Sequence, residues 1–371
     1  MKPSLEITGR FILRNSLYEF QRISEKQMRV TLNQIAEAAG VSRGTVDRAL
    51  NNRGRINPEV AERIIQLAKD MGYQRNLAGR ALALSRTDLR IGVLVQAAET
   101  PFIKNVLAGI EEAQDQVSEF GFEVLIRKIP DIDPAHALAA LHELAEANCS
   151  GIAMMPLDDP EFVGLVNSLS EEGIPLVTFN SDIENSGRQC FVGEDTLRSG
   201  KAAAGLMGQI LAPDADVLVI SGYPDFQAHR NRTSGFVSEL PLIRGDLKLM
   251  PVMYALDDEK KVEEIVSRVL SGRKESSALG IYVAAAGLEG AGRAVREAAG
   301  RSGNVRLISH DLTDRNIRLL KNGEVDFLIG QDPHTQGFEP IMILFRQLFE
   351  NRPPVDRPLY TEITIKTKYN V

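Results

Sequence analysis

From about residue 90 to the C-terminus, short apolar runs alternate with segments whose apolar residues recur every three or four positions. The runs are IGVLV, FEVLI, GIAMMP, IPLVTFN, DVLVISG, LKLMPVMYA, LGIYVAA, VRLISHD and VDFLIGQD. Runs of this length predict buried strands, and the segments between them predict helices. This alternation is typical of parallel sheets covered by helices, and about 280 residues are enough for two such lobes. The predicted class of this body is therefore α/β.

Residues 28–75 follow a helical pattern instead. Thr31 and Gln34 form a capping box, which predicts a helix over 32–39, and Gly40 supplies a left-handed stop. Ser42 caps a second helix, in which three apolar residues share one face: Val46, Ala49 and Leu50. Two short helices joined by a tight glycine turn form a helix-turn-helix arrangement.

A third helix is predicted directly afterwards. Asn57 is its N-cap, Pro58 lies in its first turn, and Gly72 ends it. Its apolar residues recur at helical spacing: Val60, Ile64, Leu67, Ala68 and Met71. The three helices together predict a small all-α head.

The polar face of the second helix suggests what the head contacts. It presents Arg43, Thr45, Asp47, Arg48 and Asn51 once the apolar face is assigned. Arginine and asparagine can read base edges in the major groove of DNA. Asp47 either accepts from a cytosine amino group or pairs with Arg43 four residues earlier. The alternative for this region is a helical bundle with an ordinary charged face.

The charge of the chain is unevenly distributed. The net charge is −7, but residues 28–90 hold 11 Lys and Arg against 6 Asp and Glu, a net of +5 that leaves −12 elsewhere. A basic module on an acidic body favours a polyanionic partner for the head, although solvated basic segments are also common. The sequence contains neither a run long enough to span a bilayer nor the features of a signal peptide, so we expect a cytoplasmic protein. Cys149 and Cys190 lie far apart without metal-ligand spacing, and no metal or cofactor is predicted.

The segment VTLNQIAEAAGVSRGTVDRAL resembles the head of the lac repressor (LacI) family of bacterial regulators, whose pattern runs V-T-x-x-x-[IV]-A-x-x-A-G-V-S-x-x-T-V-[SD]-R. The resemblance implies that Arg43 and Gly44 occupy base-reading positions. It places Thr45 and Arg48 on further DNA contacts, and Thr31 and Ser42 on phosphate contacts. Since Gly44 has no side chain, we expect fewer base contacts than the family usually makes.

Residues 76–89 are similar to the family's hinge helix, which folds when paired with its dimer mate in the minor groove. Leu82 falls on the position of the leucine that wedges between base pairs, and Asn76 is a further expected DNA contact. The alternative is a floppy linker, because so short a segment with Gly79 inside does not hold a helix alone. Residues 1–27 precede the family pattern and are interpreted as a disordered tail or a misplaced start codon.

Side chains at strand ends suggest a ligand site in the body, since open α/β sheets bind ligands outside the carboxyl ends of their strands. An aromatic ring, amides, carboxylates and a guanidinium group suit the hydroxyls and apolar ring face of a sugar. The candidates are Phe102, Asn180, Ser181, Arg230, His310, Asp311 and Gln331.

The body, residues 90–371, resembles the type I periplasmic sugar-binding-protein fold, which is also the effector domain of the lac repressor family. The resemblance rests on TPF, IPLVTFNSD, AHRNRTSGF, HD and GQDP. It implies one lobe over about 90–196 plus 332–356, another over about 197–331 plus 357–371, and a cleft between them. The residues that it places in the cleft are Phe102, Asn180, Arg230, Asp311 and Gln331. Where the family usually has an Asn-Asp pair, residues 284–286 are alanines, so the ligand is smaller there, less hydroxylated, or held by His310 instead.

These features predict a transcriptional regulator, most simply a repressor, that acts as a homodimer. Its partners would be a near-palindromic double-stranded operator and a small sugar or sugar derivative. A solute-binding or sensor protein is the alternative, which fits the body but not the head. An enzyme is disfavoured because the sequence has no GxSxG, P-loop or HExxH motif, and GLEGAG does not have the spacing of a dinucleotide-binding loop.

Overall fold

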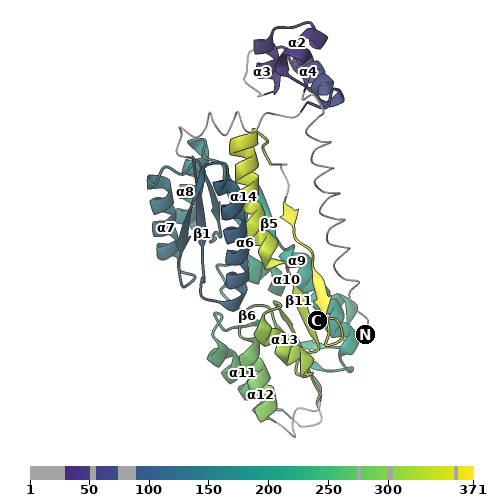
Figure 1. The fold of residues 1–371 in the computed structure, drawn as a ribbon. Coiled ribbons are helices and arrows are strands. Elements are labelled where there is room, and N and C mark those ends of the chain that lie inside the picture. Colours follow the sequence, from purple (N-terminus) through teal and green to yellow (C-terminus); the bar gives the residue numbers. More distant parts are fainter. Residues whose placement is uncertain (1–29, 51–55, 74–88, 274–276, 299–303, 355–357) are drawn as a thin grey trace, which may run out of the picture. The chain divides into compact units, whose positions relative to one another are not determined.

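The computed structural model describes residues 30–50, 56–73, 89–273, 277–298, 304–354 and 358–371 (Figure 1). The chain divides into two compact units, Met1–Leu82 and Ala83–Val371, which we treat separately as head and body. The predictions for residues 1–27, for Asn51, and for the hinge with Asn76 and Leu82 lie outside the described residues.

The head consists of three helices, as predicted. They are α2 (Leu32–Ala39), α3 (Arg43–Leu50) and α4 (Pro58–Asp70). Each contributes one large, fully buried side chain to a common core: Ile35, Val46 and Ile64. Burying these three groups together fixes how the short helices pack, since helices of eight residues are marginal alone.

The predicted caps are confirmed and place α3 relative to α2. The Thr31 hydroxyl accepts the Gln34 N–H at 3.3 Å, and the Gln34 side chain accepts the Thr31 N–H at 2.7 Å. Gly40 has a left-handed φ of 66° and ends α2. The Ser42 hydroxyl accepts the Thr45 N–H at 3.1 Å and so caps α3. Bonds of this kind satisfy the free N–H groups of a helix start.

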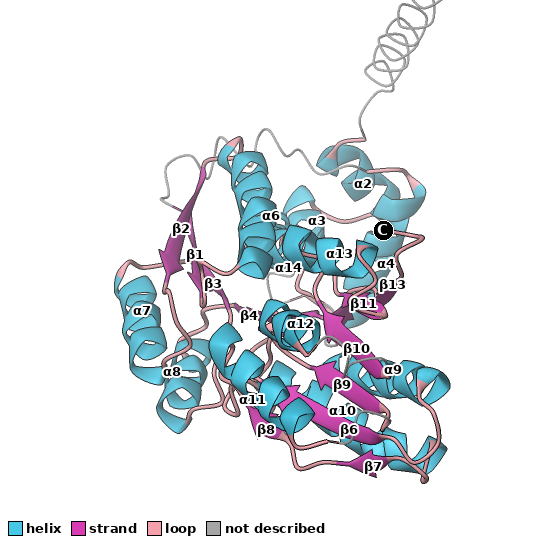
Figure 2. Ribbon diagram, turned by 90° about the horizontal axis from the view of Figure 1, so that it is seen from below, coloured by secondary structure: helices cyan, strands magenta, loops and turns pink. Residues whose placement is uncertain are grey.

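The first lobe of the body is built on a parallel sheet in the order β12-β5-β4-β3-β1-β2. Its strands are β1 (Leu89–Val95), β2 (Phe122–Lys128), β3 (Gly151–Met154), β4 (Leu176–Phe179), β5 (Cys190–Gly193) and β12 (Leu359–Tyr360). Its helices are α6 (Pro101–Ser118), α7 (Pro134–Glu146), α8 (Pro160–Glu171) and α14 (Pro333–Glu350). These helices cover the sheet in Figures 1 and 2.

The second lobe repeats this architecture in the order β13-β11-β10-β9-β6-β7, with β8 also paired to β6. Its strands are β6 (Asp216–Ser221), β7 (Lys248–Leu249), β8 (Met253–Tyr254), β9 (Leu279–Val283), β10 (Val305–His310), β11 (Phe327–Gly330) and the antiparallel β13 (Thr364–Lys366). Its helices are α9 (Thr196–Ile210), α10 (Gln227–Ile243), α11 (Glu259–Ser271), α12 (Leu288–Glu297) and α13 (Asp314–Lys321). The α/β class with parallel sheets is therefore confirmed.

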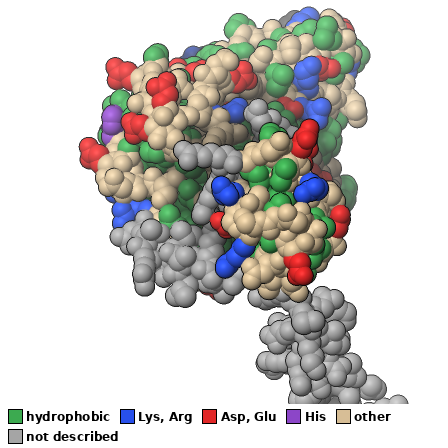
Figure 3. All heavy atoms as spheres, turned by 90° about the horizontal axis from the view of Figure 1, so that it is seen from above, with side chains coloured by type: hydrophobic (Ala, Val, Ile, Leu, Met, Phe, Trp, Pro, Cys, Tyr) green, Lys and Arg blue, Asp and Glu red, His purple; other side chains and the backbone are tan. Residues whose placement is uncertain are grey.

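Both faces of the second sheet are buried. Successive residues of β6 alternate between two separate apolar clusters, with Val217 and Val219 in one and Leu218 and Ile220 in the other. This alternation explains why these strands read as continuous apolar runs in the sequence. Most charged side chains of the described residues remain outside, and Figure 3 shows acidic and basic groups interspersed over one face of the molecule.

Two strand predictions require correction. The run LKLMPVMYA forms two short strands, β7 and β8, because Pro251 between them has no N–H to donate to a sheet. The strand β12 joins the first lobe's sheet, so the last crossing into the second lobe follows residue 360 and not residue 356. Short β5, β12 and β13 were not predicted.

The chain crosses between the lobes after β5, after β11 and after β12, and a buried polar residue follows each strand. These residues are Glu194, Gln331 and Thr361. The Thr361 N–H donates to the Gly193 carbonyl at 2.8 Å, and the Thr361 hydroxyl donates to the Gln331 carbonyl at 2.9 Å. The three crossings are thus bonded to one another.

Glycines allow the closest helix contacts of the first lobe. A Cβ atom added to Gly109 of α6 would lie 2.1 Å from the His334 carbonyl oxygen, and one added to Gly337 of α14 would lie 2.0 Å from the Val106 carbonyl oxygen. Both of these neighbours are backbone carbonyl oxygen atoms. They could make room for a Cβ atom only if the two helices moved apart. The pair α6–α14 therefore depends on both glycines.

We expect Gly337→Ala to lower the free energy of unfolding of the body by at least about 2 kcal/mol, since overpacking outweighs the helix propensity gained. The matched control is Gly164→Ala in α8, where an added Cβ meets nothing within 4 Å. That variant should be neutral or more stable by about 0.5–1 kcal/mol. Urea unfolding followed by circular dichroism measures both, and equal effects would contradict the prediction.

Candidate functional site

A pocket lies between the two lobes at the carboxyl ends of their strands. It contains about 910 Å³ of space not occupied by atoms, part of it open to solvent. The first lobe contributes Ala97, Thr100, Phe102, Ile132, Met155 and Asn180. The second contributes Phe226, His229, Arg232, Asp257, Ala285, Ala286, Asp311, Thr313 and Asn316, and Gln331 lies at a crossing. This combination of an apolar wall with a few convergent polar groups is typical of a small-molecule site.

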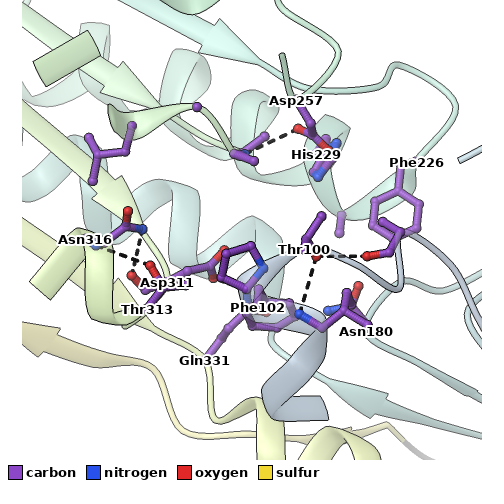
Figure 4. A pocket seen from close by; sticks show the side chains of 18 of the residues that line it. Thr100, Phe102, Asn180, Phe226, His229, Asp257, Asp311, Thr313, Asn316 and Gln331 are labelled. Carbon is purple, nitrogen blue, oxygen red and sulfur yellow. Dashed lines mark hydrogen bonds between the residues drawn. The ribbon is translucent and has the colours of Figure 1, made fainter. Parts of the chain in front are cut away.

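Four of the predicted cleft residues line this pocket: Phe102, Asn180, Asp311 and Gln331. Figure 4 shows Asp311 beside Thr313 and Asn316 of the second lobe, and Phe102 and Asn180 of the first lobe close by. Phe102 comes from the first turn of α6, and the other three directly follow strands β4, β10 and β11. The structure thus brings together side chains that are up to 229 residues apart in the chain.

The backbone at these strand ends is in a strained conformation. Ala97, Asn180, Asp257 and Asp311 all line the pocket and have φ angles of 50°, 63°, 61° and 71°. Such angles lie in the left-handed region, which is uncommon for residues other than glycine, although Asn and Asp tolerate it best. Strain of this kind clusters at functional sites. Its repetition at four strand ends marks the pocket independently of its side chains.

A chain of side-chain hydrogen bonds connects the two lobes beneath the pocket. Gln331 donates to Asp311 at 2.6 Å, and Gln336 of α14 donates to the Gln331 side-chain oxygen at 3.2 Å and to its backbone carbonyl at 2.6 Å. Asn180 in turn donates to the Gln336 side chain at 3.0 Å. Asn180 and Asp311, one from each lobe, are therefore linked through the crossing at Gln331.

One of the lining residues, Arg232, belongs to a buried ion pair. Arg232 of α10 donates through Nε and Nη2 to Glu194 Oε2, at 2.8 and 2.6 Å, and both side chains are at most 5% exposed. Burial opposes the charge of Arg232, but the carboxylates of Glu194 and Asp311 outweigh it and raise the pKa of the guanidinium. Since Glu194 lies at the first crossing, this pair joins the crossing to the second lobe.

Burial also raises the pKa of Asp311, against the opposing effects of Arg232 and of the hydrogen bond from Gln331. Burial lowers the pKa of His229, whose Nδ1 accepts the Tyr223 N–H at 3.0 Å. The buried pocket therefore favours a neutral His229, with Arg232 as its charged donor.

Ser181 and His310, two predicted contacts, lie outside the lining of this pocket. The His310 Nε2 and the Tyr282 hydroxyl are 2.7 Å apart, and burial lowers the pKa of His310 well below its usual range. The Ser181 hydroxyl accepts the Ala228 N–H at 3.3 Å and faces a neighbouring depression. Both residues support the pocket from behind, so His310 does not replace the missing Asn-Asp pair.

Arg230, a further predicted contact, also lies outside the lining. Its guanidinium group bonds to Asp158 of the first lobe at 2.5 Å and to the Pro224 carbonyl at 2.8 Å. Arg232 occupies the expected place in the pocket. Residues two apart on a helix point in nearly opposite directions, so this two-residue difference decides which arginine faces the ligand.

Asp257 compensates in part for the alanines at 284–286. Ala285 and Ala286 line the pocket, and the Asp257 carboxylate accepts the Ala286 N–H at 3.3 Å (Figure 4). Asp257 follows β8, the strand hidden in the run that we interpreted as one strand. Sequence reasoning missed it for that reason, and it missed Arg232, His229, Thr313 and Asn316 because they lie within helices or loops.

The head presents a polar face on α3. Ser42, Arg43, Gly44 and Arg48 are exposed, and Thr31 at the start of α2 is exposed as well. Thr45 and Asp47 are half-buried. Arg48 Nε donates to the Gly44 carbonyl at 3.1 Å, so its guanidinium group lies along the helix.

In the described part of the chain, no group of three or more His, Cys, Asp or Glu side chains is arranged to hold a metal ion. None of the described helices is long and apolar enough to cross a membrane.

Comparison with known proteins gives two family matches. Residues 91–351 match the periplasmic binding protein domain, and residues 31–76 match the bacterial regulatory proteins of the lacI family. Both matches agree with the resemblance inferred from the sequence.

Individual relatives are distant. The chain is 27% identical to the HTH-type transcriptional regulator DegA of Bacillus subtilis over 56% of this chain and 60% of that protein. It is 28% identical to the sucrose operon repressor of Klebsiella pneumoniae over 58% and 62%. The alignments thus span about three fifths of these regulators. The fold is similar to GanP, a glucose-galactose binding protein from Geobacillus stearothermophilus, with a TM-score of 0.70, 19% identity and coverage of 77% of this chain and 99% of that one.

The ion pair between Arg232 and Glu194 provides a stability prediction. Glu194→Gln keeps the shape of the side chain but leaves the Arg232 charge buried without its partner, so we expect a loss of about 3–5 kcal/mol in the free energy of unfolding. The control is Asp158→Asn, which breaks the half-exposed pair with Arg230 and should cost less than about 1 kcal/mol. Urea unfolding of the whole chain tests both, and similar losses would refute the special role of the buried pair.

Proposed function

The chain belongs to the periplasmic binding protein domain family over residues 91–351 and carries a lacI-family helix-turn-helix head over residues 31–76, and on this premise we propose that it is a DNA-binding transcriptional regulator controlled by a small sugar-like ligand. The single observation that carries the proposal is the presence of both parts on one chain. A solute-binding protein needs only the pocket, and a constitutive DNA-binding protein needs only the head.

The head supports the DNA-binding part of the proposal. Arg43 and Arg48 are exposed at the beginning and end of α3, which is the helix that enters the major groove in helix-turn-helix proteins. Thr31 and Ser42 cap the starts of α2 and α3, where N–H groups and helix dipoles favour phosphate groups. We infer that Arg43, Thr45 and Arg48 read bases, with Asp47 and Asn51 beside them. Thr31 and Ser42 contact the phosphate backbone of the DNA.

The regulator acts as a homodimer in the cytoplasm on a near-palindromic operator, because two-fold symmetry in the protein is mirrored in the DNA site. We propose that the segment 76–89, with Asn76 and Leu82, contacts the minor groove; the proposal rests on the family resemblance, because Asn76 and Leu82 lie outside the described residues. Repression is the simplest mode of action, and the relative from Klebsiella is named a repressor.

The pocket supports the ligand part. Its walls come from both lobes, so a ligand that contacts both stabilises one arrangement of the lobes over others. Phe102 offers an apolar face, while Asn180, Arg232, Asp311 and Gln331 offer hydrogen-bonding groups. Linkage is reciprocal: a ligand that weakens operator binding is itself bound less tightly by the DNA complex.

Selection of fragments from the source genome with the purified protein, followed by sequencing, tests the proposal. Enrichment of one palindromic motif is the expected result. A sugar that changes the affinity of the protein for that motif is the expected result for the ligand part of the proposal. Failure to enrich any motif, with and without a sugar mixture, together with tight sugar binding, would support a solute-binding protein instead.

We expect Arg48→Ala and Arg43→Ala each to weaken binding to the selected operator about 5- to 100-fold, since a good base contact contributes about 1–3 kcal/mol. Gln66→Ala on the exposed face of α4 serves as the control and should change affinity less than about 3-fold. Fluorescence anisotropy at fixed salt concentration measures all three. Unchanged affinity in both arginine variants would exclude α3 as the recognition helix.

A further inference from the structure

The charge of the pocket restricts the ligand further. We propose, on the basis of the function proposed above, that the pocket takes a polyol without negative charge and favours one that bears a protonated amino group. Sugar acids and sugar phosphates are excluded.

The buried arginine adds no net positive charge. Arg232 faces the pocket, but Glu194 lies directly against it, with two hydrogen bonds of 2.8 and 2.6 Å. An anionic ligand would therefore meet an already neutralised guanidinium group. A ligand hydroxyl can still accept from N–H groups of Arg232 that do not point at Glu194, because the guanidinium group has five donors. Arg232 thus contributes directional donors and not a counter-charge.

Carboxylates outnumber cations in the rest of the lining. The ionisable Asp, Glu and Arg residues among the described lining are Asp257, Glu259, Glu289, Asp311, Arg232 and Arg315. Arg315 already pairs with Glu289 at 3.1 Å and approaches Glu259 at 3.7 Å. Glu259 also bonds to Arg293 at 3.4 Å, but Arg293 is shared with a further carboxylate, Glu263, at 2.9 Å. The balance stays negative even if Asp311, whose pKa is raised by burial, binds a proton. His229 does not alter it, because burial lowers its pKa.

The hydrogen-bonding groups favour donors on the ligand. Asn316 uses its amide N–H groups on the carbonyl oxygens of His310 and Asp311, at 3.1 and 3.0 Å, so its own oxygen is the group that it can offer. Gln331 donates one side-chain N–H to Asp311, and Asn180 donates one to Gln336. What the second lobe presents is mainly acceptors: the carboxylates of Asp257 and Asp311 and the amide oxygen of Asn316. Hydroxyl and ammonium groups satisfy acceptors, whereas a carboxylate or phosphate does not.

The test uses matched series of sugars with the full chain. For glucose, galactose and mannose, the neutral sugar, the 2-amino sugar and the uronic acid are compared by isothermal titration calorimetry at pH 7. Within the parent sugar that binds, we expect the uronic acid to bind at least 10-fold more weakly than the neutral form. The amino form should bind as tightly as the neutral form or more tightly.

Asp257→Asn identifies the group responsible. It should reduce the ratio between amino and neutral affinity at least 3-fold, while Glu161→Gln, an exposed carboxylate at the start of α8, leaves that ratio unchanged. A uronic acid that binds as tightly as its neutral parent overturns the charge proposal and leaves the ligand-controlled regulator intact. If no member of any series binds, both the sugar-like ligand and the charge proposal fail, while operator selection still decides the DNA-binding role. An unchanged ratio in Asp257→Asn overturns the assignment to that carboxylate.

Discussion

The buried pair between Arg232 and Glu194 is the interaction on which the body most depends. Glu194 lies at the first crossing between the lobes, and Arg232 lies in the second lobe at the pocket wall. Neither charge is tolerable alone at this depth, since an isolated buried ion costs several kcal/mol. The pair therefore forces the end of β5 and helix α10 to stay together whatever the lobes do. The pair fixes the second lobe to the first crossing between the lobes.

The other crossings are fixed by neutral hydrogen bonds. Thr361 bonds to the Gly193 and Gln331 carbonyls, and Gln331 bonds to Asp311 of the pocket. A ligand that contacts Asp311 or Asn180 therefore touches residues whose remaining bonds end at the crossings. Ligand contact and lobe geometry share the same few polar groups, because buried amides must be satisfied in every state. The same hydrogen bonds are therefore enough to couple the pocket to the crossings between the lobes.

The sequence was sufficient for the class of fold, the three helices of the head and their caps, because these depend on local chemistry: a capping box, a left-handed glycine, and apolar periodicity. It was also sufficient for four pocket residues, three of which follow strands directly. It failed where a position depends on three-dimensional register. Arg230 and Arg232 differ only in the side of α10 on which they lie. Asp257 was hidden because Pro251 divides an apolar run into two strands, and the ion pair with Glu194 could not be foreseen because the partners are separated by a crossing.

Few direct contacts join the two lobes among the described residues. Their free energy limits how strongly the protein without ligand can favour the arrangement in which the lobes touch. Three direct ties join the lobes beside the pocket: the Asp158–Arg230 ion pair, the Asp158 N–H bond to the Asp225 carbonyl at 3.3 Å, and the Ala228 N–H bond to the Ser181 hydroxyl at 3.3 Å. The exposed ion pair contributes no more than about 1 kcal/mol, and each hydrogen bond contributes about 0.5–1.5 kcal/mol. A shift from almost entirely one state to almost entirely the other needs about 5.5 kcal/mol. The remainder has to come from contacts that a ligand in the pocket makes to both lobes at once.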